Sequence, residues 1–390
     1  MHSIGFTAAV AAASFAGVPL TQGDSASAVA LVTGQERADK GESTLDFAAL
    51  AAFPGTLVFY MGVTTAEHWA GQLMAHGKRA DTPAVIVRRA SWPDQLTVPC
   101  TLDTVAAQIL QRRLRPPVIV LVGEVARVSD ALDWFHRRPL FGQHVIVTRP
   151  TEQTGGLVDR LEELGASVLV QPAIEIGPPP DWGPLDAALA RLPDFDWLVF
   201  SSANGVRFTL NRLMETARDV RALAGLKLAA IGPATADALA AFHLRTDLVP
   251  GEYRAEALAA ALASQAAGRR FLLVRASRGR EVLAEQLHAA GGHVEQIVAY
   301  TSRDVPAPQS DVVATLSEHA GVWVTVTSSA IARSLARLFG ERLRGARLAS
   351  ISPVTSATLH ELGLEPAVEA AEYTTSGLVA AILAAAAPAA

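Results

Sequence analysis

The side chains best suited to chemistry in this sequence are hydroxyl and amide groups that follow short apolar segments. Such segments read as strands of an open α/β sheet, where ligands bind beyond the carboxyl ends of the strands. The same hydroxyls could instead serve only as helix N-caps, so both roles stay open here. The candidates are Ser201, Ser202 and Asn204 in one turn, Thr327, Ser328 and Ser329 in a second, and Thr235 and Thr355 in a third pair of turns.

Arginines form a second group of candidates. Arg149 and Arg275 directly follow apolar segments, Ser277 and Arg278 come just after Arg275, and Arg347 precedes another such segment. A guanidinium can hold a carboxylate through two parallel hydrogen bonds, which suits an anionic ligand. An arginine in solvent without such a contact fits each position equally well.

Tyr300 is the candidate for direct chemistry. It lies in the alternating stretch 292–304 (GHVEQIVAYTSRD), which we interpret as a strand that leaves one domain and enters another. A phenol is protonated near neutral pH and can donate a proton to a leaving group. The alternative is a tyrosine that packs against the interdomain linker.

The elements that position these residues occur twice. The stretch 197–207 (WLVFSSANGVR) is similar to 323–333 (WVTVTSSAIAR), and 228–239 (LAAIGPATADAL) is similar to 348–359 (LASISPVTSATL). A strand-helix-strand unit at 144–176 is repeated at 271–304. Self-similarity at long spacing indicates duplication, so we expect a duplicated α/β protein after about residue 141.

The preceding part of the chain also alternates strands with helices. Strands are expected at 29–33, 56–61, 84–87 and 118–122, and helices at 65–76 and 102–111. Residues 129–142 (SDALDWFHRRPLFG) form a charged and aromatic connector, which marks a domain boundary.

Composition excludes several classes of function. A net charge of −5 gives no sign of nucleic-acid binding, and a lone cysteine, Cys100, favours a reducing compartment. The ten histidines form no metal-binding pair, so no metal is expected. The apolar start lacks the basic residues of a signal peptide, and the Ala-rich end is too short to span a membrane. We therefore expect a cytoplasmic protein.

From about residue 143 to 387 the sequence resembles uroporphyrinogen-III synthase. Motifs in the order of that family are HVIVTRP, LVFSSANGV, AIGPATADAL, LVRASRGRE, IVAYTS and SISPVTSATL. The resemblance implies two flavodoxin-like α/β lobes, and it implies cyclisation of hydroxymethylbilane with inversion of ring D, without metal or cofactor. In family terms Tyr300 matches the proposed proton donor. The other candidates above would bind the eight carboxylates of the substrate, a task that suits hydroxyls and helix N-termini.

Residues 1 to about 135 resemble the C-terminal half of uroporphyrinogen-III C-methyltransferase. The similarity rests on GVPLT, VTGQE, GTLVFYMGV, DTPAVIV, PPVIVLVGEV and LDWF, while Gln22 and Gly23 depart from the family. By resemblance Thr21, Tyr60 and Met61 would line a cleft for S-adenosylmethionine. The glycine-rich domain that completes this cleft does not precede Met1, so binding is expected only if another half is supplied.

These observations lead to a division of the chain and to three hypotheses of function. The expected units are a truncated methyltransferase domain (1–128), a connector (129–142), one lobe from 143–172 plus 303–387, and a second lobe from 177–297, with linkers near 172–180 and 298–304. The leading hypothesis is a uroporphyrinogen-III synthase that acts on hydroxymethylbilane and contacts hydroxymethylbilane synthase. The alternatives are a bifunctional methyltransferase and synthase, and a two-lobed binding module without catalysis.

Overall fold

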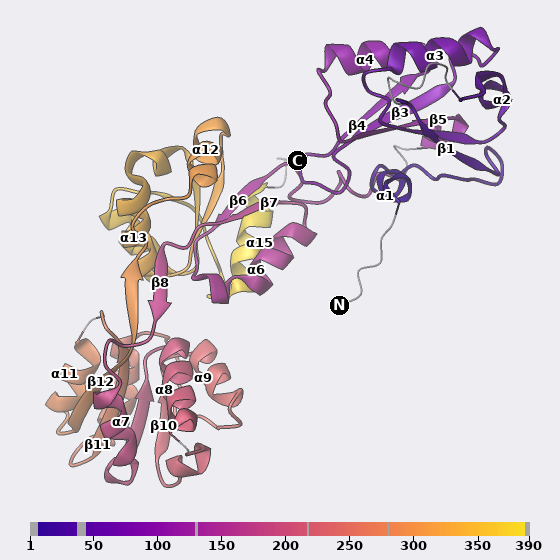
Figure 1. Cartoon of the computed structure of the whole chain (residues 1–390). Helices are drawn as coiled ribbons and strands as arrows, with labels where there is room; N and C mark the ends of the chain where they lie inside the picture. Colours follow the sequence, from indigo (N-terminus) through magenta and orange to yellow (C-terminus); the bar gives the residue numbers. More distant parts are fainter. Residues whose placement is uncertain (1–6, 37–43, 129–131, 217, 280, 387–390) are drawn as a thin grey trace.

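The protein is an α/β structure built on three five-stranded sheets. A computed structural model describes residues 7–36, 44–128, 132–216, 218–279 and 281–386. Each sheet is accompanied by its own helices, and the three bodies follow one another in space (Figure 1). Within these residues no helix is both long enough and apolar enough to cross a membrane.

The first sheet has the order β1-β2-β5-β3-β4, with β1 and β2 parallel and the other pairs antiparallel. Its centre is apolar: Phe59 stacks on the fully buried Trp69 at 4.0 Å between ring centroids. The elements are β1 (Val29–Thr33), β2 (Thr56–Tyr60), β3 (Pro83–Arg88), β4 (Leu96–Thr101), β5 (Val118–Val122), α1 (Ala8–Phe15), α2 (Phe47–Ala52), α3 (Ala66–Ala75), α4 (Val105–Gln111) and the 3₁₀ helix η1 (Glu124–Val128).

The four strands and two helices expected in this part are confirmed within a few residues, whereas β4 was not predicted. β4 contains Pro99, which has no N–H to donate and normally argues against a strand. The strand tolerates it because β4 is the edge of the sheet and pairs on one side only, with β3.

The second sheet, β15-β14-β13-β6-β7, is parallel throughout. Numbered in chain order its strands run 2-1-3-4-5, which is the flavodoxin-like order. Its elements are β6 (His144–Val147), β7 (Ser167–Val170), β13 (Trp323–Val326), β14 (Arg347–Ser350), β15 (Pro366–Glu369), α6 (Gly155–Glu163), α12 (Ser310–Glu318), α13 (Ser329–Phe339), α14 (Pro353–Glu361), α15 (Thr375–Ala386), η2 (Thr151–Gln153) and η5 (Gly340–Gly345).

The third sheet has the order β10-β9-β11-β12-β8, with β8 antiparallel to its neighbour. Its elements are β8 (Ile174–Gly177), β9 (Trp197–Phe200), β10 (Lys227–Ala230), β11 (Arg270–Ala276), β12 (His293–Asp304), α7 (Gly183–Ala190), α8 (Ala203–Glu215), α9 (Pro233–Ala240), α10 (Ala255–Ala263), α11 (Val282–Ala289), η3 (Leu192–Asp194) and η4 (Val220–Leu223).

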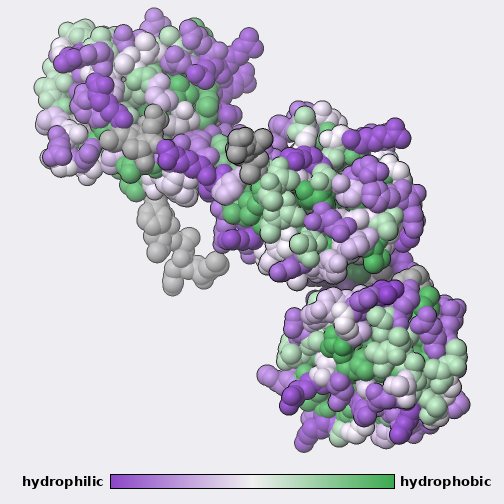
Figure 2. All heavy atoms as spheres, turned by 180° about the vertical axis from the view of Figure 1, so that it is seen from behind, coloured by the Kyte–Doolittle hydropathy of each residue, from purple (hydrophilic) through white to green (hydrophobic). Residues whose placement is uncertain are grey.

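The chain passes between the second and third sheets twice, at adjacent places. The strand-helix-strand unit expected at 144–176 is wrong at its end. Two strands, β7 and β8, replace the single second strand, because Pro172 lies between them and cannot continue the hydrogen bonding of β7. The returning strand β12 pairs with β11 up to Tyr300, and its residues Thr301–Asp304 then pair with β8. The two crossings lie side by side (Figure 1), and the bodies of the second and third sheets are in contact there (Figure 2).

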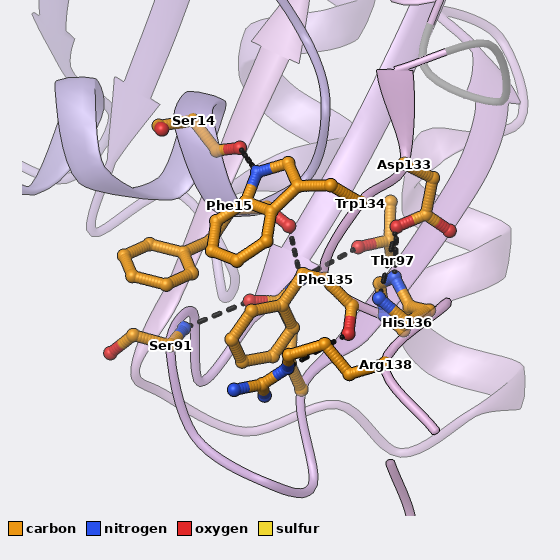
Figure 3. Close-up of polar contacts among 10 residues, drawn as sticks. Ser14, Phe15, Ser91, Thr97, Asp133, Trp134, Phe135, His136 and Arg138 are labelled. Carbon is orange, nitrogen blue, oxygen red and sulfur yellow. Dashed lines mark hydrogen bonds and ion pairs between the residues drawn. The ribbon is translucent and has the colours of Figure 1, made fainter. Parts of the chain in front are cut away.

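The connector is held from both sides. Trp134 donates its indole N–H to the Ser14 carbonyl of α1 at 3.0 Å, and Phe15 packs edge-on against the buried Phe135 (Figure 3). On the other side the Arg138 guanidinium lies 3.8 Å above the Phe135 ring and donates to the Glu162 carbonyl at the end of α6. The aromatic cluster therefore ties α1 to the second sheet. Residues 129–131 of the expected connector lie outside the described residues.

Gly17 offers a test of this docking. It has a φ of +65°, and a Cβ placed there would lie 2.6 Å from the backbone of Leu132. Gly17→Ala should therefore destabilise the junction by about 1–3 kcal/mol, through left-handed strain and the clash. The measurement is thermal unfolding. Gly23→Ala is the control, because a Cβ at Gly23 meets nothing within 4 Å, and equal melting temperatures of the two variants would contradict the prediction.

Candidate functional site

The parallel strands of the two lobe sheets end in turns that carry the predicted hydroxyls. In the third sheet β9 ends at Phe200, and Ser202 caps α8 by accepting a hydrogen bond from the Gly205 N–H at 3.0 Å. In the second sheet Ser328 caps α13 in the same way, accepting from the Ile331 N–H at 3.2 Å. Both caps are thus real, and each places a hydroxyl at the positive end of a helix.

Tyr300 shares the cap of α8. Its hydroxyl lies 2.9 Å from Ser202 Oγ, and its ring stacks on Phe208 at 5.7 Å between centroids. Tyr300 is only 7% exposed, and this burial raises the pKa of its phenol, while the weaker effect of the hydrogen bond from Ser202 acts in the opposite direction. The phenol is therefore protonated across the neutral range. Ser202, which is partly exposed, is the member of the pair nearer to solvent.

The remaining hydroxyls take different positions. Ser201 donates to the Val274 carbonyl at 3.2 Å, and Ser329 accepts from Thr358 at 2.8 Å, so both are engaged within their lobes. Thr235 and Thr355 are 3% and 2% exposed, which withdraws them from the surface. Thr327 lies half-buried at the end of β13, and Ser277 accepts from the Ser302 N–H at 3.2 Å.

Asn204 joins the two lobes at this site. Its Oδ1 accepts a hydrogen bond from the Gln153 side-chain amide at 2.9 Å, and Gln153 belongs to η2, just after β6 of the other sheet. The same oxygen accepts from the Arg207 guanidinium. The carboxyl ends of β6 and β9 are therefore linked by a direct polar contact.

The predicted arginines are not brought together. Arg149 donates to Thr375 Oγ1 at 3.1 Å, and burial lowers the pKa of its guanidinium. Arg275 is paired with the Glu281 carboxylate, which neutralises its charge. Arg347 opens β14, lies 4.0 Å above the Trp323 ring and donates to the Ala385 carbonyl, so it occupies the opposite edge of the sheet from the hydroxyl turns.

A second polar cluster at the crossing was not foreseen. Asp304, the last residue of β12, accepts from the Arg278 guanidinium at 2.6 Å, from Arg337 at 2.6 Å and from Ser334 at 2.5 Å. Arg278 follows β11 of one lobe, whereas Ser334 and Arg337 lie on α13 of the other. Burial alone would raise the pKa of Asp304, but the hydrogen bonds from Ser334 and Arg278 and the charges of both arginines outweigh it and lower the pKa. The carboxylate is an ionic bridge between the lobes.

The methyltransferase-like part places its candidate residues differently. The Tyr60 hydroxyl accepts from the Ala9 N–H at 2.7 Å and contacts Thr7, so it is engaged with the first turn of α1. Met61, at the end of β2, has a φ of 50° and is 60% exposed, and Thr21 is exposed in the loop before β1. Tyr60 is thus held by α1, whereas Met61 and Thr21 face solvent, so these residues do not form an enclosed site for S-adenosylmethionine.

The chain is similar to two families of known proteins. Residues 156–380 match the family described as uroporphyrinogen-III synthase HemD, and residues 5–106 match the tetrapyrrole (corrin/porphyrin) methylases. The porphyrin biosynthesis protein HemD of Ruminiclostridium josui is 33% identical over 261 residues, which are 67% of this chain and 52% of that protein. The uroporphyrinogen-III synthase of Synechococcus elongatus is 35% identical over 255 residues, which are 63% of this chain and 96% of that protein.

A further relative is a methyltransferase. The S-adenosyl-L-methionine-dependent uroporphyrinogen III methyltransferase of Methanosarcina barkeri is 40% identical over 128 residues, which are 33% of this chain and 50% of that protein. The chain therefore spans about half the length of the Ruminiclostridium and Methanosarcina relatives. Two sheets with capped helices at facing strand ends define a two-lobed α/β protein. The chain belongs to the uroporphyrinogen-III synthase HemD family, with a methylase-related segment before it.

The ionic bridge at Asp304 gives a test of how the lobes are held. Asp304→Asn leaves Arg278 and Arg337 without their shared anion, which should weaken the interlobe contact by about 1 kcal/mol, given partial exposure. Small-angle X-ray scattering at neutral pH should show a larger radius of gyration. Glu175→Gln, an exposed carboxylate on the adjacent strand β8, is the control.

The same bridge has a defined pH dependence. A carboxyl with a lowered folded-state pKa stabilises the fold fully above its unfolded pKa, about 3.9, and loses that stabilisation as the pH falls below it. Wild-type protein should therefore approach the dimensions of Asp304→Asn in acid. If the two proteins have the same dimensions already at neutral pH, the bridge does not hold the lobes.

Proposed function

We propose that this protein is a uroporphyrinogen-III synthase that closes hydroxymethylbilane into uroporphyrinogen III with inversion of ring D. The observation that carries the proposal is the Tyr300–Ser202 pair at the N-terminus of α8, facing the lobe that carries the matching cap of α13. We assign residues 143–172 and 303–387 to one lobe and 177–297 to the other. Identity of 35% to the Synechococcus synthase, 96% of which is covered, supports the proposed activity.

The reaction needs a proton for the departing hydroxyl and a fixed geometry for ring D. In this proposal Tyr300 is the proton donor and acts through Ser202: Ser202 Oγ passes a proton to the terminal hydroxyl, which leaves as water, and takes the phenol proton of Tyr300 in its place. Attack by the substituted carbon of ring D on the azafulvene gives a spiro intermediate, which fragments and recloses. The proton lost from ring D on closure balances the one donated, so the net change is the loss of one water.

The two lobes supply position rather than further chemistry. The bilane closes unaided to the type I isomer, so the enzyme must favour one conformation of ring D over another. The capped helices offer positive ends to the carboxylates of the substrate from both sides. Arg149, which has no carboxylate partner among the described residues, is the strand-end arginine best placed to add a charge.

The assay is chromatographic separation of the oxidised type I and type III porphyrins formed from fresh hydroxymethylbilane. Purified protein without added metal or cofactor should yield type III.

Tyr300→Phe keeps the ring stacking on Phe208 and removes one donor, so turnover should fall by about 10- to 1,000-fold, as for general acid catalysis. The product should shift toward type I. Tyr253→Phe, an exposed tyrosine, is the control. Wild-type protein that leaves only type I would support the non-catalytic binding module instead.

For the methylase-related segment we propose no methyl transfer by this chain alone. Tyr60 is engaged with α1 and Met61 faces solvent, so a bound nucleoside would be held on one side only. Titration calorimetry with S-adenosylmethionine should give no isotherm in the micromolar range. Micromolar binding, or methylation of uroporphyrinogen III, would favour the bifunctional alternative.

A further inference from the structure

A cavity of about 380 Å³ lies beside α8, at the junction of the two lobes. Its volume is at the lower end of the range for small-molecule sites. It adjoins Tyr300 through Phe208 but does not include the hydroxyl turns. The lining residues that matter here are Glu152, Trp182, Arg207, Phe208, Arg212 and Glu215, and we name this cavity the α8 pocket.

One wall of the α8 pocket is aromatic. The Trp182 and Phe208 rings lie 6.4 Å apart with 31° between their planes, and Phe208 in turn stacks on Tyr300 at 14°. Three rings thus form a row from the pocket to the phenol of the proposed proton donor. A flat, electron-rich heterocycle can stack against such a wall with favourable offset geometry.

The charges around the pocket leave one cation available. Arg212 is neutralised, because it holds Asp186 through two bonds of 2.8 and 2.6 Å and also contacts Glu215 at 3.2 Å. Arg207 donates only to the neutral Asn204 amide, and none of the carboxylates in the described part of the chain pairs with it. An incoming carboxylate would therefore find its partner in Arg207.

Glu152 disfavours binding of a carboxylate in the α8 pocket, whereas Arg207 favours it. It lies in η2 of the other lobe and is exposed at the rim of the pocket, where its negative charge repels an anionic ligand. Arg207 and Glu152 thus make opposite contributions to binding of the same carboxylate. Substitutions of Arg207 and Glu152 should therefore change ligand affinity in opposite directions. Structural damage to the pocket would instead weaken binding in both variants.

We propose that the α8 pocket binds one carboxylate-bearing pyrrole ring of the linear tetrapyrrole, with the ring against Trp182 and Phe208 and a carboxylate on Arg207. The proposal rests on the proposed synthase function. It assigns the pocket to a single ring, because the cavity is too small for the four-ring chain. It also places that ring one aromatic side chain away from Tyr300.

The first test measures KM for hydroxymethylbilane. Arg207→Gln removes a charge-assisted pair and should raise KM by about tenfold, whereas Glu152→Gln removes a repulsion and should lower KM by about twofold. Arg344→Gln, an exposed arginine paired with Glu341 on η5, should leave KM unchanged. Shifts of KM in the same direction for Arg207→Gln and Glu152→Gln would overturn the proposal.

The second test does not require turnover. A pyrrole with one acetate and one propionate arm is titrated against the protein, and tryptophan fluorescence is recorded. We expect saturable quenching that weakens in Arg207→Gln and is lost in Trp182→Phe. If wild-type protein makes the type III isomer but the pyrrole causes no quenching, the pocket assignment fails and the synthase function stands. If the pyrrole binds in an Arg207-dependent manner while only type I forms, the pocket stands and the synthase function fails.

Discussion

One carboxylate binds groups from both lobes at the point where the chain crosses between them. Asp304 ends the strand that returns from the third sheet, and it holds Arg278 from one lobe and Arg337 from the other. A carboxylate with two guanidinium partners and a hydroxyl is better satisfied than an isolated surface pair, and its contribution of about 1 kcal/mol lies at the upper end of the range for such pairs. Together with the Gln153–Asn204 bond, it brings the carboxyl ends of two sheets into one site.

The proposed proton donor is controlled by its packing. Tyr300 lies in the strand that leads to Asp304, so the residues that position the lobes also fix the phenol. Phe208 covers the Tyr300 ring, and the Tyr300 hydroxyl is hydrogen-bonded to Ser202 at the start of α8. Burial keeps the phenol protonated, so its proton is available when the hydroxyl of the substrate departs. The chemistry therefore depends on a hydrophobic contact as much as on the hydroxyls.

Much of this protein could be predicted from periodicity and repetition. The duplicated segments around Ser202 and Ser328 become equivalent helix caps, and the alternating stretch that ends at Asp304 becomes β12. Local patterns predict such elements because both the strand period and the cap chemistry are local. β4 was missed because Pro99 argues against a strand unless the strand is known to be an edge.

The charged partners in the site were less predictable. Arg275 is the penultimate residue of β11 and Arg278 follows that strand, yet one is neutralised by the nearby Glu281 and the other bridges to another lobe. No spacing rule distinguishes them, because pairing is decided by where remote segments meet. Arg347 was expected near the substrate from its resemblance to the family, but it opens its strand, and the opening residue of a parallel strand lies at the far edge of the sheet.

The paired crossing of β8 and β12 has a consequence for how this protein can be altered. Ile174 and Asp304 are directly opposite each other in the antiparallel ladder, so the segment between them leaves and re-enters the host body at one point. The lobe of the third sheet is therefore a domain inserted into the lobe of the second sheet. If the inserted domain were deleted, the remaining chain would have to span only the distance between two neighbouring strands. The parallel sheet of β6, β7, β13, β14 and β15 would keep all of its strands. The inserted domain could therefore be exchanged for that of a relative by joining the chains at the β8–β12 crossing.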